Sequence, residues 1–146
     1  MDNLGLTVWE SLPTVDKKLR DAGLRDRIKL IASGKMVNPS GVAAALCLGA
    51  DSVNTARGFM FALGCIQALQ CNQNTCPTGI TTHDPKLQKG LNPISKADRV
   101  ASYARSIKKE VELIAHSSGV MEARNLSLQH AFQIGPDGGA RLLSES

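Results

Sequence analysis

The sequence predicts an α/β protein in which helices alternate with short strands. Hydrophobic residues make up 42% of its 146 residues and charged residues 21%, a composition that favours a globular chain over a disordered one. Segments with the apolar spacing of a helix alternate with short apolar runs typical of strands. A strand, a helix and a second strand in succession form a βαβ unit, which indicates a parallel sheet with a right-handed crossover.

The first predicted helix spans residues 8–22. Pro13 is expected in its first turn, and Gly23 is expected to stop it. Apolar residues recur along this segment at helical spacing: Trp9, Leu12, Val15 and Leu19.

The βαβ unit follows this helix. The apolar run 28–32 precedes a Ser-Gly pair and predicts a buried strand that leads into a turn. Asn38 is the expected cap of the next helix, with Pro39 in its first turn, and Gly49 closes it. Residues 50–58, ADSVNTARG, predict the second strand.

The next segment joins a helix to a polar loop. Residues 57–70 predict a helix that delivers Cys65 and Cys71 to the start of a loop over residues 72–93, which is rich in Asn, Thr, Pro and Gly. Reactive groups are therefore expected on a loop that a helix holds in place.

A long helix is predicted to begin at Ser95, where Asp98 completes an approximate capping box, and to stop at Gly119. The tail over residues 134–146 is expected to be frayed. The helix carries an apolar stripe that needs a core to cover it: Val100, Ala104, Ile107, Val111 and Ile114.

Charge and composition argue against nucleic acid and membranes as partners. The net charge of +4 is mild, and only four aromatic residues accompany Trp9, too few for a stacking platform. No apolar run reaches membrane-spanning length, and the N-terminal stretch MDNLGLTVWE lacks the features of a signal peptide. We therefore expect a cytoplasmic protein that binds neither nucleic acid nor membrane.

Three of the four cysteines stand close together, at Cys65, Cys71 and Cys76. In a reducing compartment such a cluster indicates metal ligands or reactive groups rather than a disulfide framework. Thiolates select a soft metal: zinc, for which His83 is a candidate fourth ligand, or an iron–sulfur cluster. The alternative is three buried or inert thiols, and the spacing alone leaves these interpretations open. Cys47 lies on an apolar helix and is expected in the core.

Other catalytic constellations are not recognisable. His83, His116 and His130 are scattered, and neither a Ser-His-Asp triad nor a carboxylate pair stands out. His116 lies near a helix end, where a surface position is expected.

Three stretches resemble the end of the FMN-binding synthase domain of glutamate synthase, especially in its single-domain relatives: RIKLIASGK, GADSVNTARGFMFALGCIQALQCNQNTCPTGITTHDP and KADRV. The resemblance covers nearly the whole chain, and the cysteine segment with its Cys-Pro-Thr-Gly end is specific. It implies a (β/α)8 TIM barrel that binds FMN and a 3Fe-4S cluster and makes glutamate reductively from 2-oxoglutarate and ammonia-derived nitrogen. It also implies that Cys65, Cys71 and Cys76 are the cluster ligands.

The resemblance further implies an FMN phosphate site on the loops after the last two barrel strands, where backbone N–H groups and a helix N-terminus face the anion. Glycine there permits close backbone approach, hydroxyls can donate hydrogen bonds, and two basic residues supply positive charge. Without the resemblance, these loops would be interpreted as a glycine turn with two exposed bases. Asn54 either faces the ligand or satisfies the backbone at the strand end. The expected residues are Ser33, Gly34, Lys35, Thr55, Ala56 and Arg57.

The chain departs from the family in length. A complete barrel needs roughly 200 to 250 residues, and only the last two of eight strands are recognisable. We therefore expect a fragment, with residues 1–94 as a partial barrel segment and residues 95–146 as a long helix and flexible tail of the same structural unit. Unpaired strand edges favour self-association, a complementing barrel portion as partner, or a rearranged helical packing.

Two functions are compatible with these features. The first is a fragment of a glutamate-synthase-like oxidoreductase that carries the cluster ligands and the phosphate end of the FMN site, with the isolated chain inactive and the electron donor not identified. The second is a non-enzymatic remnant, a small helix-rich binding module, monomeric or oligomeric, with an empty or zinc-filled cysteine site.

Overall fold

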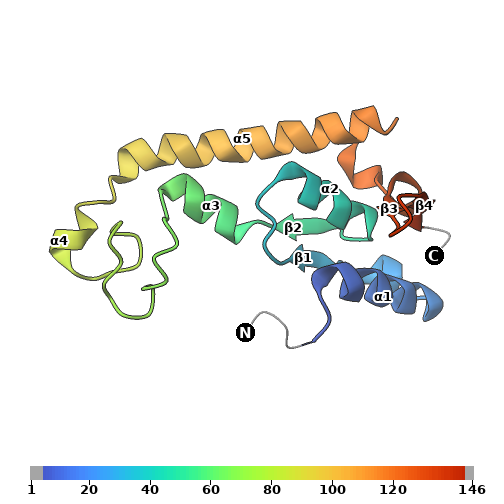
Figure 1. Cartoon of the computed structure of the whole chain (residues 1–146), viewed down its shortest axis with the longest axis horizontal. Helices are drawn as coiled ribbons and strands as arrows, with labels where there is room; N and C mark the ends of the chain where they lie inside the picture. Colours follow the sequence, from blue (N-terminus) through green and yellow to red (C-terminus); the bar gives the residue numbers. More distant parts are fainter. Residues whose placement is uncertain (1–4, 144–146) are drawn as a thin grey trace.

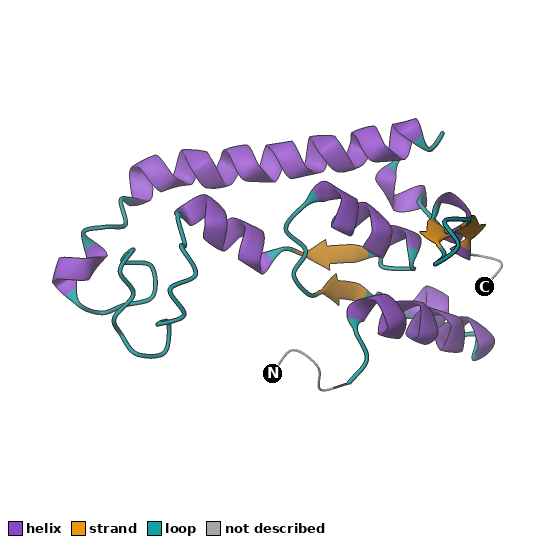
Figure 2. Cartoon of the chain, in the orientation of Figure 1, coloured by secondary structure: helices purple, strands orange, loops and turns teal. Residues whose placement is uncertain are grey.

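The computed structural model describes residues 5–143 and has a mixed α/β fold of helices with two small sheets (Figures 1 and 2). None of the helices in this part of the chain is long and apolar enough to cross a membrane. In chain order the elements are α1 (Val8–Asp21), η1 (Arg25–Arg27), β1 (Ile31–Ser33), α2 (Pro39–Cys47), β2 (Ser52–Asn54), α3 (Ala56–Leu63), α4 (Pro85–Gln88), α5 (Pro93–Ser117), η2 (Ala123–Asn125), η3 (Leu128–His130), β3 (Phe132–Ile134) and β4 (Ala140–Leu142).

Helix α1 begins at Val8, before the start that Pro13 predicted. The backbone N–H and the hydroxyl of Thr7 both donate to the carboxylate of Glu10, at 2.9 and 2.7 Å, and this local pair sets the start at Val8. Pro13 lies inside the helix, so its predicted place in the first turn is wrong. The predicted stop is confirmed, because Gly23 has a φ of +66° at the helix end.

The predicted βαβ unit is confirmed, although both of its strands are shorter than expected: β2 covers only Ser52–Asn54 of the predicted 50–58, and α3 begins at Ala56. Strands β1 and β2 pair in parallel, with Ala32 opposite Val53 and Ser33 opposite Asn54. The buried strand predicted over residues 28–32 is observed only from Ile31, whose side chain is 61% exposed, whereas Ala32 is buried. The prediction assumed cover on both faces, but a two-stranded sheet buries only one of them here.

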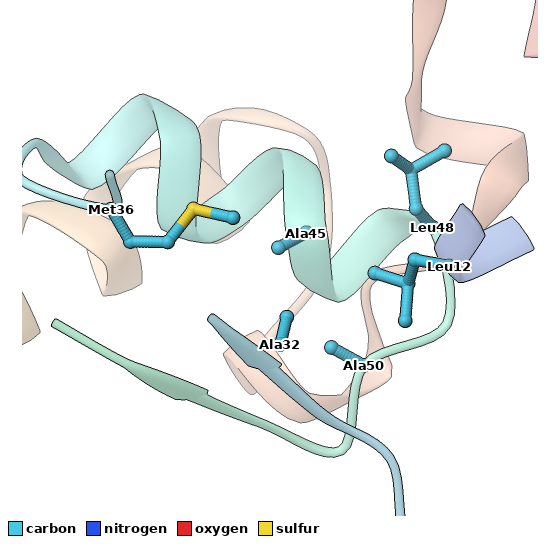
Figure 3. Packing of buried hydrophobic residues seen from close by; sticks show 6 residues of the cluster. All are labelled: Leu12, Ala32, Met36, Ala45, Leu48 and Ala50. Atoms are coloured by element: carbon cyan, nitrogen blue, oxygen red, sulfur yellow. The ribbon is translucent and has the colours of Figure 1, made fainter. Parts of the chain in front are cut away.

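Small side chains allow α2 to pack closely on this sheet. The first core cluster consists of Leu12, Ala32, Met36, Ala45, Leu48 and Ala50, drawn together in Figure 3. A second cluster lies between α2 and the end of α5 and consists of Ala43, Cys47, Ala115, Val120 and Leu126. Cys47 is therefore a core residue, as predicted, and burial raises the pKa of its thiol.

Helix α3 is shorter than predicted. It ends at Leu63 because Gly64 takes a left-handed conformation with a φ of +103°. Cys65 and Cys71 therefore lie on the loop after the helix, and the prediction of a helix through residue 70 is wrong. The loop that carries the cysteines projects at one end of the molecule, beside α4 (Figure 1).

Helix α5 runs along both α2 and α3 and joins the core to the cysteine end of the molecule (Figure 1). The predicted cap at Ser95 and Asp98 is wrong, because the helix begins at Pro93 and the Asn92 side chain accepts from the backbone N–H groups of Ile94 and Ser95. The predicted stop at Gly119 is confirmed by its φ of +78°. The apolar stripe faces α2 and α3, and Val111 is its buried member.

The C-terminal tail is ordered into a hairpin, contrary to the expectation of fraying. Strands β3 and β4 pair in antiparallel fashion, and the N–H of Leu143 donates to the carbonyl of Ala131 at 2.9 Å. Residues 144–146 of the predicted frayed tail lie outside the described residues.

One arginine connects the first helix to the βαβ unit. The Arg25 side chain, only 12% exposed, forms ion pairs with Asp16 of α1 and with Asp51 before β2. It also donates to the carbonyl oxygens of Ile28 and Gly49, both at 2.8 Å. Gly49 has a φ of +104°, and a Cβ there would lie 2.7 Å from the Asp16 carboxyl carbon, so only glycine fits this turn.

Replacement of Arg25 by methionine should destabilise the fold by about 3 kcal/mol, because it removes the common partner of the buried Asp16 carboxylate and of the partly exposed Asp51 carboxylate. Urea unfolding followed by circular dichroism measures this loss. Arg27→Met, which changes an exposed arginine two residues away, is the matched control and should have little effect. Equal stabilities for the two variants would contradict the role assigned to Arg25.

The same network predicts a loss of stability in acid. Burial on its own would raise the pKa of Asp16, but hydrogen bonds from Arg20 and Arg25 outweigh burial and lower that pKa below its usual value. Burial would likewise raise the pKa of Asp51, but hydrogen bonds from the backbone N–H of Leu30 and from Arg25 lower it. The stabilisation is complete above the pKa of an unfolded aspartate, about 3.9, and is lost as pH falls through the lower folded values. Unfolding free energies measured from pH 7 downward should therefore hold until about pH 4 and decline below it, and the gap between the wild type and Arg25→Met should narrow over the same acid range.

Candidate functional site

The residues predicted to hold phosphate meet at one edge of the small parallel sheet. Ser33 and Asn54 are paired at the carboxyl ends of β1 and β2, so the loops that follow the two strands leave the sheet side by side. The first loop turns at Gly34, with a φ of +153°, and at Lys35, with a φ of +55°. The structure therefore brings the two predicted loops together.

The N-terminus of α3 closes the second loop and is suited to an anion. Thr55 stands at the cap position without a side-chain cap bond, and the first turn contains no acidic residue. The first backbone N–H groups of a helix have no partner within the helix, and they carry its positive dipole end. Arg57 adds an exposed positive charge to the same turn.

The Thr55 hydroxyl is held by a residue that sequence reasoning missed. It lies 2.9 Å from the hydroxyl of Tyr103, which comes from α5 and also donates to the carbonyl of Val37 at 3.1 Å. The Tyr103 ring packs edge-on against Phe59, with ring centroids 5.1 Å apart. Apolar periodicity identified the stripe of α5 but contained no signal for a hydroxyl beside it, since both partners lie far away in sequence.

The three clustered cysteines line a single pocket of about 470 Å³ between the end of α3 and the loop that follows. Ala56 and Arg57, at the start of α3, line the same pocket, so the predicted phosphate edge adjoins the thiols. The rest of its lining is apolar or neutral: Met60, Phe61, Ile66, Gln67, Ala68, Leu69, Gln70, Thr78, Ile80 and Thr81.

Unfavourable backbone conformations are concentrated in these two loops. Among the described residues, those other than glycine with positive φ are Lys35 in the first phosphate loop and Gln67, Leu69 and Asn74 in the cysteine loop. Left-handed backbone costs an ordinary residue about 1 to 2 kcal/mol. Residues keep these unfavourable conformations only where the surrounding structure enforces them, and residues of this kind cluster at functional sites.

Asn74 fixes the turn that precedes Cys76. Its side-chain oxygen accepts from the N–H of His83 at 2.6 Å, and its carbonyl accepts from the hydroxyl of Thr82 at 2.7 Å. Gly79 packs so closely on the carbonyl of Leu87 that a side chain there would clash. The cysteine loop is thereby closed on itself before α4 begins.

Cys76 is the most buried of the three pocket cysteines. Its sulfur lies 3.3 Å from the hydroxyl of Thr78, and this hydrogen bond, with a contribution from Thr81, lowers the pKa of the thiol to about 6. The Thr81 hydroxyl is buried and has no regular hydrogen-bond partner among residues 5–143. The back of the pocket therefore favours a thiolate.

The three sulfur atoms share the pocket without converging on one point. Cys65 is half-buried and Cys71 is exposed. Within the described part of the chain, no three Cys, His, Asp or Glu side chains lie close enough together to hold a metal ion. His83 is exposed and does not line the pocket. The assignment of the cysteines as ligands thus stays a prediction.

Together these features define an α/β protein in which two loops at a sheet edge adjoin a thiol-lined pocket. A family profile described as a conserved region in glutamate synthase matches residues 1–121. The glutamate synthase large subunit-like protein YerD of Bacillus subtilis is 44% identical over 137 residues, which are 94% of this chain and 26% of that protein. The archaeal-type glutamate synthase (NADPH) of Dehalococcoides mccartyi is 35% identical over 125 residues, or 86% of this chain and 25% of that protein.

The archaeal glutamate synthase (NADPH) of Archaeoglobus fulgidus is 33% identical over a stretch of the same length, which is 24% of that protein. The chain belongs to the glutamate synthase family. It spans about a quarter of the length of these relatives.

The metal-free chain should show selective reactivity at Cys76. Its alkylation by iodoacetamide should reach half of its maximal rate near pH 6, because the reactive thiolate forms with the lowered pKa. Thr78→Val should move this midpoint upward, and Thr75→Val, which alters a neighbouring exposed threonine, should leave it unchanged. Peptide mass spectrometry measures the rate at each cysteine; an unmoved midpoint in Thr78→Val would be the contrary result.

Proposed function

We propose that the chain supplies the FMN phosphate end and the iron–sulfur ligands of a glutamate-synthase-like oxidoreductase, which in its complete form makes glutamate reductively from 2-oxoglutarate. One observation carries this proposal: Cys65, Cys71 and Cys76 line a single pocket, and Ala56 and Arg57 at the start of α3 line it as well. A flavin held by its phosphate at α3 would therefore lie next to the thiols.

The proposed phosphate site combines two loops at the sheet edge. Ser33 and Gly34 would offer a hydroxyl and an accessible backbone, and Lys35 would offer positive charge. Thr55 and Ala56 begin the α3 turn, whose unpaired N–H groups suit an anion. Arg57 would add its guanidinium to the same turn. Each contribution is electrostatic, so high salt should weaken phosphate binding.

The proposed cluster ligands suit the 3Fe-4S cluster in number and in chemistry. Cys65, Cys71 and Cys76 are soft donors of the kind that selects iron–sulfur clusters, and among residues 5–143 no carboxylate or imidazole lines their pocket. When bound, FMN and the cluster would supply the electron-transfer chemistry. The residues of this chain would hold them side by side, and the apolar pocket wall would limit the access of water.

The architecture supports a place for β1 and β2 as the last two strands of a (β/α)8 barrel. Both strands have an outer edge without a partner strand in the described structure, and the matched part of this chain covers only about a quarter of each relative. Further strands would pair with these edges, supplied by a complementing barrel portion or by a second copy. The isolated chain would be inactive, because the remaining barrel would hold 2-oxoglutarate.

A cytoplasmic location is part of the proposal. All four cysteines are free thiols in the structure, and thiols persist in a reducing compartment.

A second candidate function is a non-enzymatic binding module with an empty or zinc-filled cysteine site. The observation that favours it is that the three sulfur atoms do not converge in the described residues. The two candidates differ in the metal that the chain takes up.

Anaerobic reconstitution of the full chain with iron and sulfide should yield broad visible absorption and about three irons per chain. Serine in place of Cys65, Cys71 or Cys76 should each lower the iron and sulfide content, because each change removes one thiolate. Cys47→Ala is the matched control, since Cys47 lies in the core, and should retain the cluster. A colourless chain that takes up zinc or no metal would favour the binding module instead.

A further inference from the structure

Tyr103 connects both halves of the proposed phosphate site from a distant part of the chain. It lies on α5, 66 residues after Val37 and 48 residues after Thr55. Val37 belongs to the loop after β1, which begins with Gly34 and Lys35. A single side-chain oxygen therefore touches the loop after β1 and the loop after β2.

The hydrogen-bond directions at this oxygen follow from its single proton. A carbonyl oxygen can only accept, so the Tyr103 hydroxyl donates to Val37 at 3.1 Å. Tyr103 can then only accept from Thr55, whose hydroxyl lies 2.9 Å away. The Thr55 proton is thus used in the bond to Tyr103, and separately the Thr55 side chain accepts no cap bond from the first turn of α3. The backbone N–H groups of that turn are left to an incoming anion.

The surroundings of Tyr103 hold its ring in place. Phe59 packs edge-on against the ring, with an interplanar angle of 85°. Gly58 is buried beneath the phenol, and a Cβ at that position would collide with the Tyr103 hydroxyl. The glycine in this turn therefore makes room for the hydroxyl bridge, although its own φ is not positive.

We propose that Tyr103 is a positioning residue for phosphate recognition: its hydroxyl bridges Val37 and Thr55 and so holds the two phosphate-binding loops at the spacing that the anion requires. This inference rests on the proposed function, because it concerns the same FMN phosphate site. Tyr103 itself does not touch the phosphate; it acts through the loop backbones. Helix α5 thereby sets the geometry of a site to which it contributes no ligand.

Flavin binding by Tyr103→Phe tests this role. The full chain is titrated into FMN and, separately, into riboflavin, which has the same ring system without the phosphate, and flavin fluorescence reports binding. The wild type should prefer FMN. Tyr103→Phe should reduce this preference about tenfold, the upper range for one lost hydrogen bond, with little change in riboflavin affinity. Inorganic phosphate should compete with FMN less effectively in the variant.

Phe59→Leu is the matched control. It removes the ring contact but leaves the hydroxyl bridge, so it should lower the melting temperature while the preference for FMN over riboflavin persists. Gly58→Ala should reproduce the loss seen in Tyr103→Phe, because the added methyl displaces the hydroxyl. An unchanged preference in Tyr103→Phe would overturn the role of Tyr103 alone. A wild-type chain that does not prefer FMN would overturn the phosphate site itself, and the role of Tyr103 with it.

Discussion

The Arg25 guanidinium is the constraint on which the rest of the fold depends. A parallel pair of three-residue strands buries little surface and makes few hydrogen bonds, so it cannot hold α1 and the crossover helix in place by itself. Arg25 provides what the sheet lacks: it ties Asp16 of α1 to Asp51 and to the Gly49 turn, and thus fixes where β2 begins. The register of β1 and β2 then places the loops after both strands at one edge.

Helix α5 connects the core of the fold to the candidate site. Its buried end packs in the second core cluster through Ala115, and its middle reaches the phosphate edge through Tyr103. The cysteine loop lies further out and is held chiefly by local contacts, such as those of Asn74. Gln67 and Leu69 of this loop take left-handed backbone conformations, which cost stability for residues other than glycine.

Local sequence signals gave the correct element wherever the deciding contact was also local. Asn38 accepts from the N–H of Gly41 and starts α2 as predicted, and Gly119 stops α5 as predicted. Errors arose where two local signals competed. Helix α1 begins after the Thr7 and Glu10 pair and not at Pro13. Asn92, and not Ser95, caps α5. Helix α3 ends at the left-handed Gly64, before the cysteines. The tail hairpin was missed because its strands have three residues each, too few for the alternation of apolar and polar residues in them to stand out.

The sequence by itself determined the family, the βαβ order and the close spacing of three cysteines, because these depend on residue types at short spacing. Only the tertiary structure decided which of these groups meet. Parallel register brings the loops after β1 and β2 to one edge, the early end of α3 places three cysteines around one pocket, and the long span of α5 carries Tyr103 to both loops. Contacts of this kind join residues tens of positions apart, and their geometry is set by packing that no local pattern in the sequence encodes.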